Sequence, residues 1–105
     1  MAIIGAPQGS FLRTTISAQN TFTEAFLISS GLFHVGISGI SGDTVHVQSS
    51  LDDGTTWRDI ASYTVDSTLT GEMGADCRIR VGVKTGNYSA GTIVAEIKQN
   101  EVPVR

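Results

Sequence analysis

The fold is decided by residues 77–84, which read Cys77-Arg-Ile-Arg-Val-Gly-Val-Lys84. Apolar side chains occupy the odd positions of this stretch, and Arg78, Arg80 and Lys84 occupy even positions. Successive side chains of a β-strand point to opposite sides of a sheet, so this alternation is typical of a strand with one buried face. We therefore expect a half-buried strand over 76–84, with Cys77 in the apolar row beside Ile79, Val81 and Val83.

Three further segments, 33–37, 44–51 and 93–98, alternate in the same way. Their predicted core-facing side chains are Phe33, Val35, Ile37, Val45, Val47, Leu51, Ile93, Ala95 and Ile97. Weaker strand patterns cover 11–18, 22–29, 57–65 and 69–73, and turn-forming residues separate the segments. About eight short strands at roughly ten-residue spacing predict an all-β, antiparallel β-sandwich of immunoglobulin-like or jelly-roll-like type.

The ends of the chain lack these patterns, so we expect an N-terminal arm at 1–9, the sandwich at 10–98 and a C-terminal tail at 99–105.

Between the alternating segments 33–37 and 44–51, the loop Ser41-Gly42-Asp43 predicts a hairpin in which Ile40 lies opposite Thr44. A three-residue loop keeps both apolar rows on one face, whereas a two-residue loop would turn one row to solvent.

Composition narrows the class of protein. The chain has 105 residues, a net charge of −3 and a charged fraction of 16%. Without a basic excess, nucleic acid is not expected as a partner. One cysteine excludes an internal disulfide, and neither a Sec signal peptide nor a membrane span is recognisable, so we expect synthesis in the cytoplasm and no membrane partner.

The sharpest local motif is Ser50-x-Asp52-x-Gly54-x-x-Trp57. It matches the Asp-box pattern known from sialidases and other β-proteins. An aspartate carboxylate accepts backbone N–H bonds within a tight turn, glycine allows positive φ, and tryptophan packs over the hairpin. We interpret these four residues as a structural turn and expect no sugar hydrolysis. The nearby carboxylates of Asp53 and Asp59 lack the spacing of a calcium loop.

No residues are arranged for catalysis, so we expect no enzyme, cofactor or metal site. The predicted hairpin places His46 opposite Ser38 and His34 about 13 Å away, at ~3.3 Å per residue, which is too far for one ion to bind both histidines. Cys77 is predicted to pack in the core, because Arg78 and Arg80 point to the other face and leave its thiol without a cationic neighbour.

Two groups of residues are candidates for binding a partner. Arg78, Arg80 and Lys84 form a basic row, which is either a solvated strand face or a contact for an acidic patch. The terminal segments carry apolar or stiff residues that gain from burial on another surface, and these are Ile3, Ile4, Pro7, Val102, Pro103 and Val104.

The chain from Phe22 to the end of its last strand resembles small virion structural proteins of tailed bacteriophages. The matching pieces are the Phe-rich strand before Gly31, Val45-His-Val-Gln-Ser-Ser-Leu-Asp-Asp-Gly-Thr-Thr-Trp57, Ile60 through Asp66, Cys77-Arg-Ile-Arg-Val-Gly-Val-Lys-Thr-Gly-Asn-Tyr88 and Gly91-Thr-Ile-Val94. The resemblance covers about three-quarters of the chain and concerns turn and core residues.

This resemblance implies a virion component, first of all a capsid decoration (cement) protein that binds and stabilises the shell of the major capsid protein. A neck, tail or baseplate subunit is the alternative, and a homo-oligomer (dimer or trimer) would add contact area. A carbohydrate-binding module is a further alternative, with Trp57, Tyr63 and Tyr88 stacking on sugar rings. Against it, Trp57 and Tyr63 share one side of the strand predicted at 57–65 and are expected to pack inward.

Overall fold

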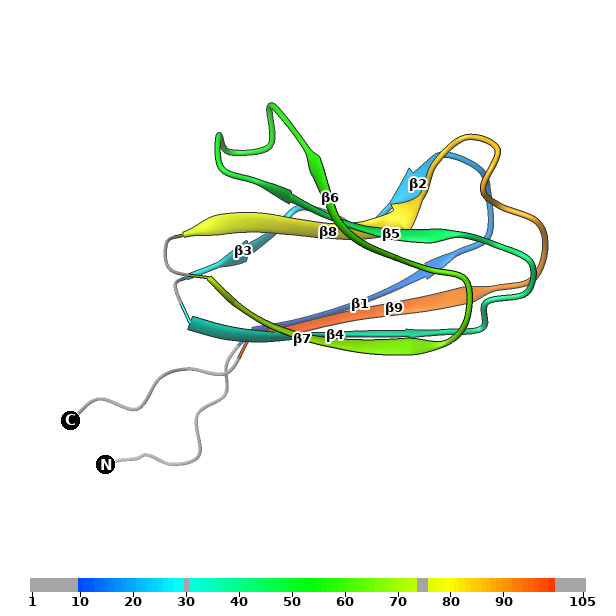
Figure 1. The fold of residues 1–105 in the computed structure, drawn as a ribbon, viewed down its shortest axis with the longest axis horizontal. Coiled ribbons are helices and arrows are strands. Elements are labelled where there is room, and N and C mark those ends of the chain that lie inside the picture. Colours follow the sequence, from blue (N-terminus) through cyan, green and yellow to red (C-terminus); the bar gives the residue numbers. More distant parts are fainter. Residues whose placement is uncertain (1–9, 30, 74–75, 100–105) are drawn as a thin grey trace.

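The structure of the chain is a computed structural model, and it describes residues 10–29, 31–73 and 76–99 (Figure 1). These residues form nine strands and no helix, in two antiparallel sheets that face each other, which confirms the predicted all-β sandwich. The strands are β1 (Ser10–Ile16), β2 (Thr21–Phe22), β3 (Phe26–Ile28), β4 (Gly31–Ser38), β5 (Val45–Ser50), β6 (Arg58–Tyr63), β7 (Ser67–Met73), β8 (Cys77–Val83) and β9 (Ile93–Gln99).

The four-stranded sheet has the order β1-β9-β4-β7 and forms the lower layer in Figure 1. The five-stranded sheet has the order β2-β8-β5-β6, with β3 pairing to β8 on the same side as β2. Six of the eight pairs of consecutive described strands therefore lie in different sheets, and β5 and β6 are the consecutive strands that pair directly. In the described ranges, no helix has the length and hydrophobicity that crossing a membrane requires.

The core lies between the two sheets and consists of the alternating apolar rows. All nine residues predicted for the rows of 33–37, 44–51 and 93–98 are buried except Leu51, and Cys77, Ile79, Val81 and Val83 of β8 are buried as predicted. Burying one Val, Ile or Phe side chain stabilises the fold by about 1.5–3 kcal/mol. These aliphatic rows on facing strands are therefore the main source of stability.

The predicted hairpin between 33–40 and 44–51 is wrong. β4 pairs with β7 and β9, whereas β5 pairs with β6 and β8, so the loop between β4 and β5 passes from one sheet to the other. Gly39 and Gly42 adopt positive φ in this loop, and Asp43 turns inward. Turn-forming residues serve a crossing between sheets as well as a hairpin, so they do not identify the partner strand.

This correction moves His46, which faces Ser62 on β6 and Gly82 on β8 instead of Ser38. It also explains Leu51, which is 79% exposed because β5 ends at Ser50 and the chain leaves the sheet there. The apolar row of β5 is therefore Val45 and Val47 alone.

The strand predicted at 22–29 is split into β2 and β3. Between them, Thr23 bonds β8 twice: its backbone N–H donates to the carbonyl of Val81 at 2.8 Å, and its hydroxyl accepts the N–H of Val81 at 3.1 Å. The side chain thus replaces a backbone acceptor, and the following two residues, Glu24 and Ala25, lie outside the ladder. As a result, Phe22 lies on the outer face of β8, whereas Phe26 packs against the core.

A β-bulge in β6 changes which way Trp57 points. Val47 pairs with Ala61 but Gln48 pairs with Asp59, so Ile60 is the extra residue. An extra residue reverses the alternation along the bulged strand. Tyr63 packs against the core, as predicted, but Trp57 lies on the outer face of the sheet, which corrects the expectation that both rings point inward.

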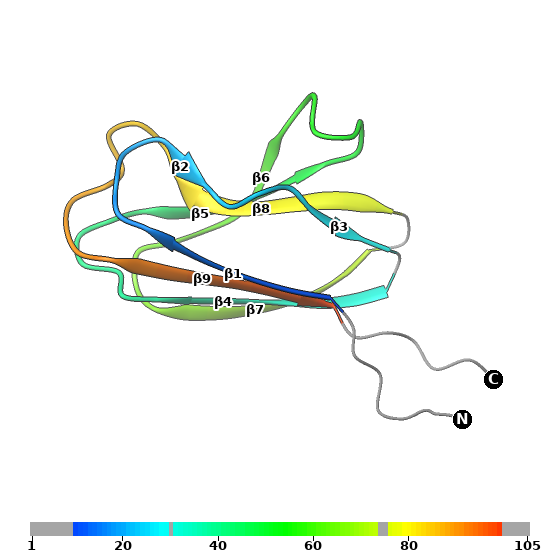
Figure 2. The same cartoon turned by 180° about the vertical axis from the view of Figure 1, so that it is seen from behind.

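The two ends of the described chain lie together. Ser10, the first residue of β1, pairs with Gln99, the last residue of β9, in adjacent antiparallel strands (Figure 2). β9 thus includes Gln99, one residue beyond the predicted domain boundary, and the Gln99 side chain accepts the N–H of Ser29 at 2.9 Å. The predicted partner-binding residues Ile3, Ile4, Pro7, Val102, Pro103 and Val104 lie outside the described residues.

Candidate interaction surface on the five-stranded sheet

The outer face of the five-stranded sheet carries the predicted basic row. Arg78, Arg80 and Gly82 of β8 lie opposite Ser50, Gln48 and His46 of β5. These residues point away from the core, yet Gln48 is 6% and Ser50 is 2% exposed. The loop 51–57 rises above this face in Figure 1.

The loop 51–57 is organised by the Asp-box residues. The Ser50 hydroxyl donates to the carboxylate of Asp52 at 2.7 Å and accepts the N–H of Gly54 at 2.8 Å. The same carboxylate accepts the N–H of Thr56 at 2.7 Å, and Gly54 has a φ of 91°. The indole of Trp57 lies over Gly54, where an added Cβ would meet it at 3.7 Å. Each of the four motif residues therefore has a structural part in the turn.

The hydroxyl of Ser50 and the N–H of Thr56 stabilise the ionised Asp52 and lower the pKa of its carboxyl to about 2. A carboxylate that accepts several hydrogen bonds holds its proton weakly, because each bond favours the charged form. The carboxylate of Asp52 is thus ionised near neutral pH, where it accepts hydrogen bonds within the turn and does not donate a proton. This favours the structural interpretation of the motif over a catalytic one.

Two members of the basic row are neutralised within the chain. Arg78 Nε lies 2.5 Å from Oδ1 of Asp53, and Lys84 Nζ lies 2.6 Å from Oδ2 of Asp59. Asp59 also accepts a hydrogen bond from the side-chain amide of Gln48 at 2.8 Å. Lys84, followed by Gln48, lowers the pKa of Asp59. Two of the three charges in the row are therefore paired within the chain, so the row is not a free cationic stripe.

Arg80 has a different environment. Its guanidinium carbon lies over two aromatic rings, 4.2 Å from the ring centroid of Phe22 and 4.3 Å from that of Trp57. Arg80 Nε donates to Oε1 of Gln48 at 2.7 Å. Partial burial lowers the pKa of Arg80, although a guanidinium remains charged at any physiological pH. Gln48, Phe22 and Trp57, which contact Arg80, are thus all neutral groups.

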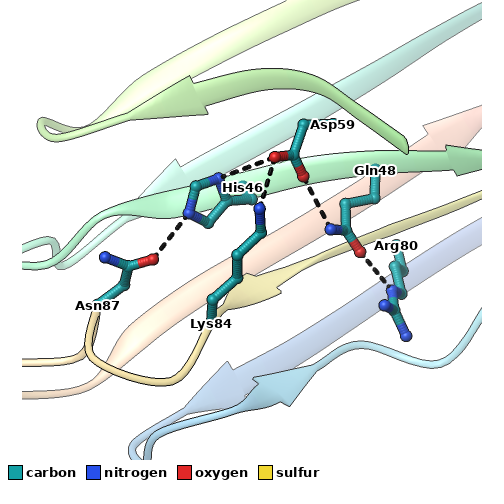
Figure 3. Close-up of polar contacts among 6 residues, drawn as sticks. All are labelled: His46, Gln48, Asp59, Arg80, Lys84 and Asn87. Atoms are coloured by element: carbon teal, nitrogen blue, oxygen red, sulfur yellow. Dashed lines mark hydrogen bonds and ion pairs between the residues drawn. The ribbon is translucent and has the colours of Figure 1, made fainter. Parts of the chain in front are cut away.

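His46 completes the network that Figure 3 shows. A hydrogen bond of 3.0 Å joins its Nε2 to Oδ1 of Asn87, and its Nδ1 lies 3.9 Å from Oδ2 of Asp59. The second distance is too long for a hydrogen bond, and the buried Nδ1 has no hydrogen-bond partner among the described residues. Polar contacts therefore run from Asn87 through His46 to Asp59, and from Asp59 through Gln48 to Arg80.

The described histidines, carboxylates and cysteine give no support to a catalytic or metal-binding site on this face. Nε2 of His46 is engaged with Asn87, so it does not activate a nucleophile. Among the described residues, no group of three or more His, Cys, Asp or Glu side chains is placed to hold a metal ion, and His34 lies in the other sheet, beside Thr70. Burial raises the pKa of the Cys77 thiol, which makes it less reactive.

The three aromatic residues considered for sugar binding are separated. Tyr63 and Tyr88 pack against the core, and the Tyr88 hydroxyl donates to the carbonyl of Gly91 at 2.6 Å. One face of Trp57 is occupied by Arg80. A stacking platform for a sugar needs exposed aromatic faces that lie together, and these rings do not provide one.

A shallow hollow adjoins this face where the loop 51–57 approaches β3. It has a volume of about 170 Å³ and is lined by Leu27, Ser50, Leu51, Asp53, Asp76, Cys77 and Arg78. Leu27 is 49% and Leu51 is 79% exposed, so its rim is apolar. The hollow is small for a ligand site, because such pockets usually measure ~300–1,000 Å³.

The alternation along β8 predicted the places of Arg78, Arg80 and Lys84, but no pattern in the sequence predicted that Phe22, Gln48, Asp59 and Asn87 join them. One available signal was Gly82, which interrupts the outer row between Arg80 and Lys84. A Cβ at Gly82 would overlap the carbonyl oxygen of Thr21 and the ring of Phe22. A glycine within a strand often marks the close approach of another segment, and here that segment carries the ring that stacks on Arg80.

Known proteins resemble this chain in structure but not in sequence. No family model and no curated protein sequence matches the chain. The structure of a Yersinia pseudotuberculosis-derived mitogen is similar, with a TM-score of 0.53 and 13% identity over 93% of this chain and 91% of that one. A protein of the disulfide-linked pili called Bacillus endospore appendages aligns with a TM-score of 0.42 and 14% identity over 95% and 96% of the two chains. The first likeness supports the sandwich fold and carries no function to this chain.

Proposed function

We propose that this chain is a structural protein of a tailed-phage particle, and specifically a decoration protein that binds the capsid shell. The observation that carries the proposal is the pairing of Ser10 with Gln99, which places the two ends of the described chain side by side. A rigid body with two adjacent attachment segments is suited to holding neighbouring subunits together. The resemblance of the turn and core motifs to small phage virion proteins supports the same function.

The region around these ends offers apolar surface for attachment. Phe11 on β1 and Leu32 on β4 are each 54% exposed and point out of the four-stranded sheet. The terminal segments add Ile3, Ile4, Val102 and Val104. A stable interface buries on the order of 1,200–2,000 Å² in total, and extended segments supply such area without enlarging the core. Ordering them has an entropic cost, so the apolar residues must become well buried on the partner.

Electron cryo-microscopy of the virion that carries this chain tests the proposal. We expect density for the nine-stranded sandwich on the outside of the capsid shell, with residues near Ser10 and Gln99 facing the major capsid protein. A ring of copies at the neck, tail or baseplate would overturn the decoration function and favour the alternative structural one. A particle without this chain would overturn both.

A truncation separates folding from attachment. Removing residues 2–9 should leave the far-ultraviolet spectrum and the melting temperature of the sandwich unchanged, because the described strands begin at Ser10. The truncated protein should bind particles lacking the native decoration at least tenfold more weakly. Gln8→Ala is the matched control and should bind like the full chain. Full occupancy by the truncated protein would contradict attachment through this segment.

A further inference from the structure

Arg80 is held in a fixed position before any partner binds. The rings of Phe22 and Trp57 both lie within 4.3 Å of its guanidinium carbon, while Gln48 accepts the hydrogen bond from Nε. An arginine side chain in solution loses rotamer freedom when it binds a ligand, and here that loss has already been incurred on folding. The two terminal nitrogens of the guanidinium point away from Gln48 in Figure 3.

The charge of Arg80 is not balanced by a carboxylate of the described chain. The arginine and lysine ion pairs of the described residues join Arg13 to Glu96, Arg78 to Asp53 and Lys84 to Asp59. The carboxylates of Asp53 and Asp59 on this side of the sheet are thus paired with Arg78 and Lys84. A partly desolvated cation without a counter-charge is unfavourable in the isolated protein and becomes favourable when an anion binds to it.

We propose that Arg80 is the recognition point of this surface and that it binds the carboxylate of an Asp or Glu side chain on a protein partner. The two terminal nitrogens of a guanidinium match the two oxygens of a carboxylate in a planar, bidentate pair. The rings of Phe22 and Trp57 flank the pair and shield it from water, which strengthens a charge-assisted hydrogen bond. The identity of the partner rests on the function proposed above, whereas the binding of a carboxylate does not.

A nucleic acid fits the site less well than an acidic protein surface. Phosphate backbones are bound by several cations together, and the neighbouring Arg78 and Lys84 already hold Asp53 and Asp59. The net charge of the chain is −3, which repels a polyanion at long range. A single carboxylate needs only the one uncompensated guanidinium.

The first experiment measures carboxylate binding directly on the full chain. The Nε–Hε resonances of Arg80 and Arg78 are followed by NMR while acetate replaces chloride at constant ionic strength. We expect the Arg80 resonance to shift and saturate, and the Arg78 resonance, which belongs to the pair with Asp53, to respond at least tenfold more weakly. An Arg80 resonance that does not move, or that moves in parallel with Arg78, would overturn the proposal.

The second experiment asks whether this site contacts the partner. Arg80→Lys keeps the charge but loses the planar pair of donors, and Arg78→Lys is the matched control on the same face of β8. We expect Arg80→Lys to bind particles at least tenfold more weakly and the control to bind within about twofold of wild type. Wild-type affinity in Arg80→Lys would overturn the assignment of Arg80 to the partner interface.

Measurements of stability distinguish a binding function of Arg80 from a purely structural one. Arg80→Met retains an apolar stem beside the two rings, so its melting temperature should stay close to that of wild type while its acetate response and particle binding are lost. Loss of folding in this variant together with normal particle binding by Arg80→Lys would show that Arg80 only holds the loop 51–57. If wild-type protein does not bind particles at all, the proposed function fails, and the acetate titration still decides the inference.

Discussion

Replacing Asp43 tests how the loops at one end of the sandwich are held together. Its side chain is 1% exposed, and its carboxylate accepts three backbone N–H bonds. The donors are Ser41 at 3.0 Å, Ser89 at a shorter distance and Ala90 at 3.2 Å. These bonds join the crossing loop after β4 to the loop before β9, which are more than forty residues apart in the sequence.

The expected loss follows from the number and kind of these bonds. A hydrogen bond to a charged group contributes about 1.5–3 kcal/mol in net terms, but the three donor residues lie at the surface, where water replaces part of each bond. We therefore expect Asp43→Ala to lower the free energy of unfolding by about 2–4 kcal/mol. Asp43→Asn keeps one oxygen acceptor but presents an amide NH₂ to a backbone donor, so its loss should be about 1–3 kcal/mol.

Lowering the pH should reduce the difference in unfolding free energy between wild type and the Asp43 variants. Burial raises the pKa of the Asp43 carboxyl, but the N–H groups of Ser41, Ser89 and Ala90 together lower it by more, so the net pKa is below the ordinary value of 3.8. The folded state then binds this proton less tightly than the unfolded state, and protonation favours unfolding. The contribution of the carboxylate is present above pH 4 and is lost as the pH falls through the ordinary value towards the folded one.

Urea unfolding at pH 7 and at pH 3 measures both effects. Asp66→Asn is the matched control, because the Asp66 carboxylate accepts one bond, from the N–H of Ile40, at an exposed site. Its loss should stay below about 1 kcal/mol. The reasoning is refuted if Asp43→Asn costs no more than the control, or if the difference between wild type and Asp43→Asn does not shrink on acidification.

Three other changes test separate parts of the structure. Gly82→Ala should lower the free energy of unfolding by about 1–3 kcal/mol in urea, because the new Cβ overlaps the backbone of β2; Gly36→Ala, where the nearest atom is a flexible side chain at 3.4 Å, should cost less. Ser50→Ala removes the hydroxyl that donates to Asp52, so the pKa of Asp52 should rise from about 2 towards its ordinary value, which carboxyl-carbon NMR measures. Cys77 is 4% exposed with a raised thiol pKa, so it should react with an aromatic disulfide reagent at pH 8 only as fast as the protein opens, and at full speed in urea.

The sequence allowed the buried rows to be predicted because a regular strand encodes its faces directly. The row of β8, from Cys77 to Val83, and that of β9, from Ile93 to Ile97, are buried as the alternation indicates. Strand partners were not predictable in the same way. The loop Ser41–Asp43 has the composition of a hairpin turn, but it leads to the other sheet because Asp43 bonds to Ser89 and Ala90, far along the chain.

Of the candidate site, the sequence predicted the residues in and next to β8 but not the neighbours that contact them. Arg80 could be placed on the outer face by counting from Val81, but its neighbours depend on two irregularities that local sequence does not reveal. The bulge at Ile60 turns Trp57 outward, and the hydrogen bonds of Thr23 to Val81 set Phe22 over Gly82. Both rings reach Arg80 through departures from regular pairing, and a strict period of two gives the wrong face for such residues.

The pairing of Ser10 with Gln99 has a consequence for protein engineering. Directly opposed residues in antiparallel strands have Cα atoms ~5 Å apart, so a short flexible linker would join them and the chain could be reopened elsewhere. The exposed turn at Thr85-Gly86 is a suitable new start, because the ladder of β8 has already ended at Val83. A protein fused there would lie at the opposite end of the molecule from one fused at the natural termini. The sandwich could therefore carry two different fused proteins on two sides.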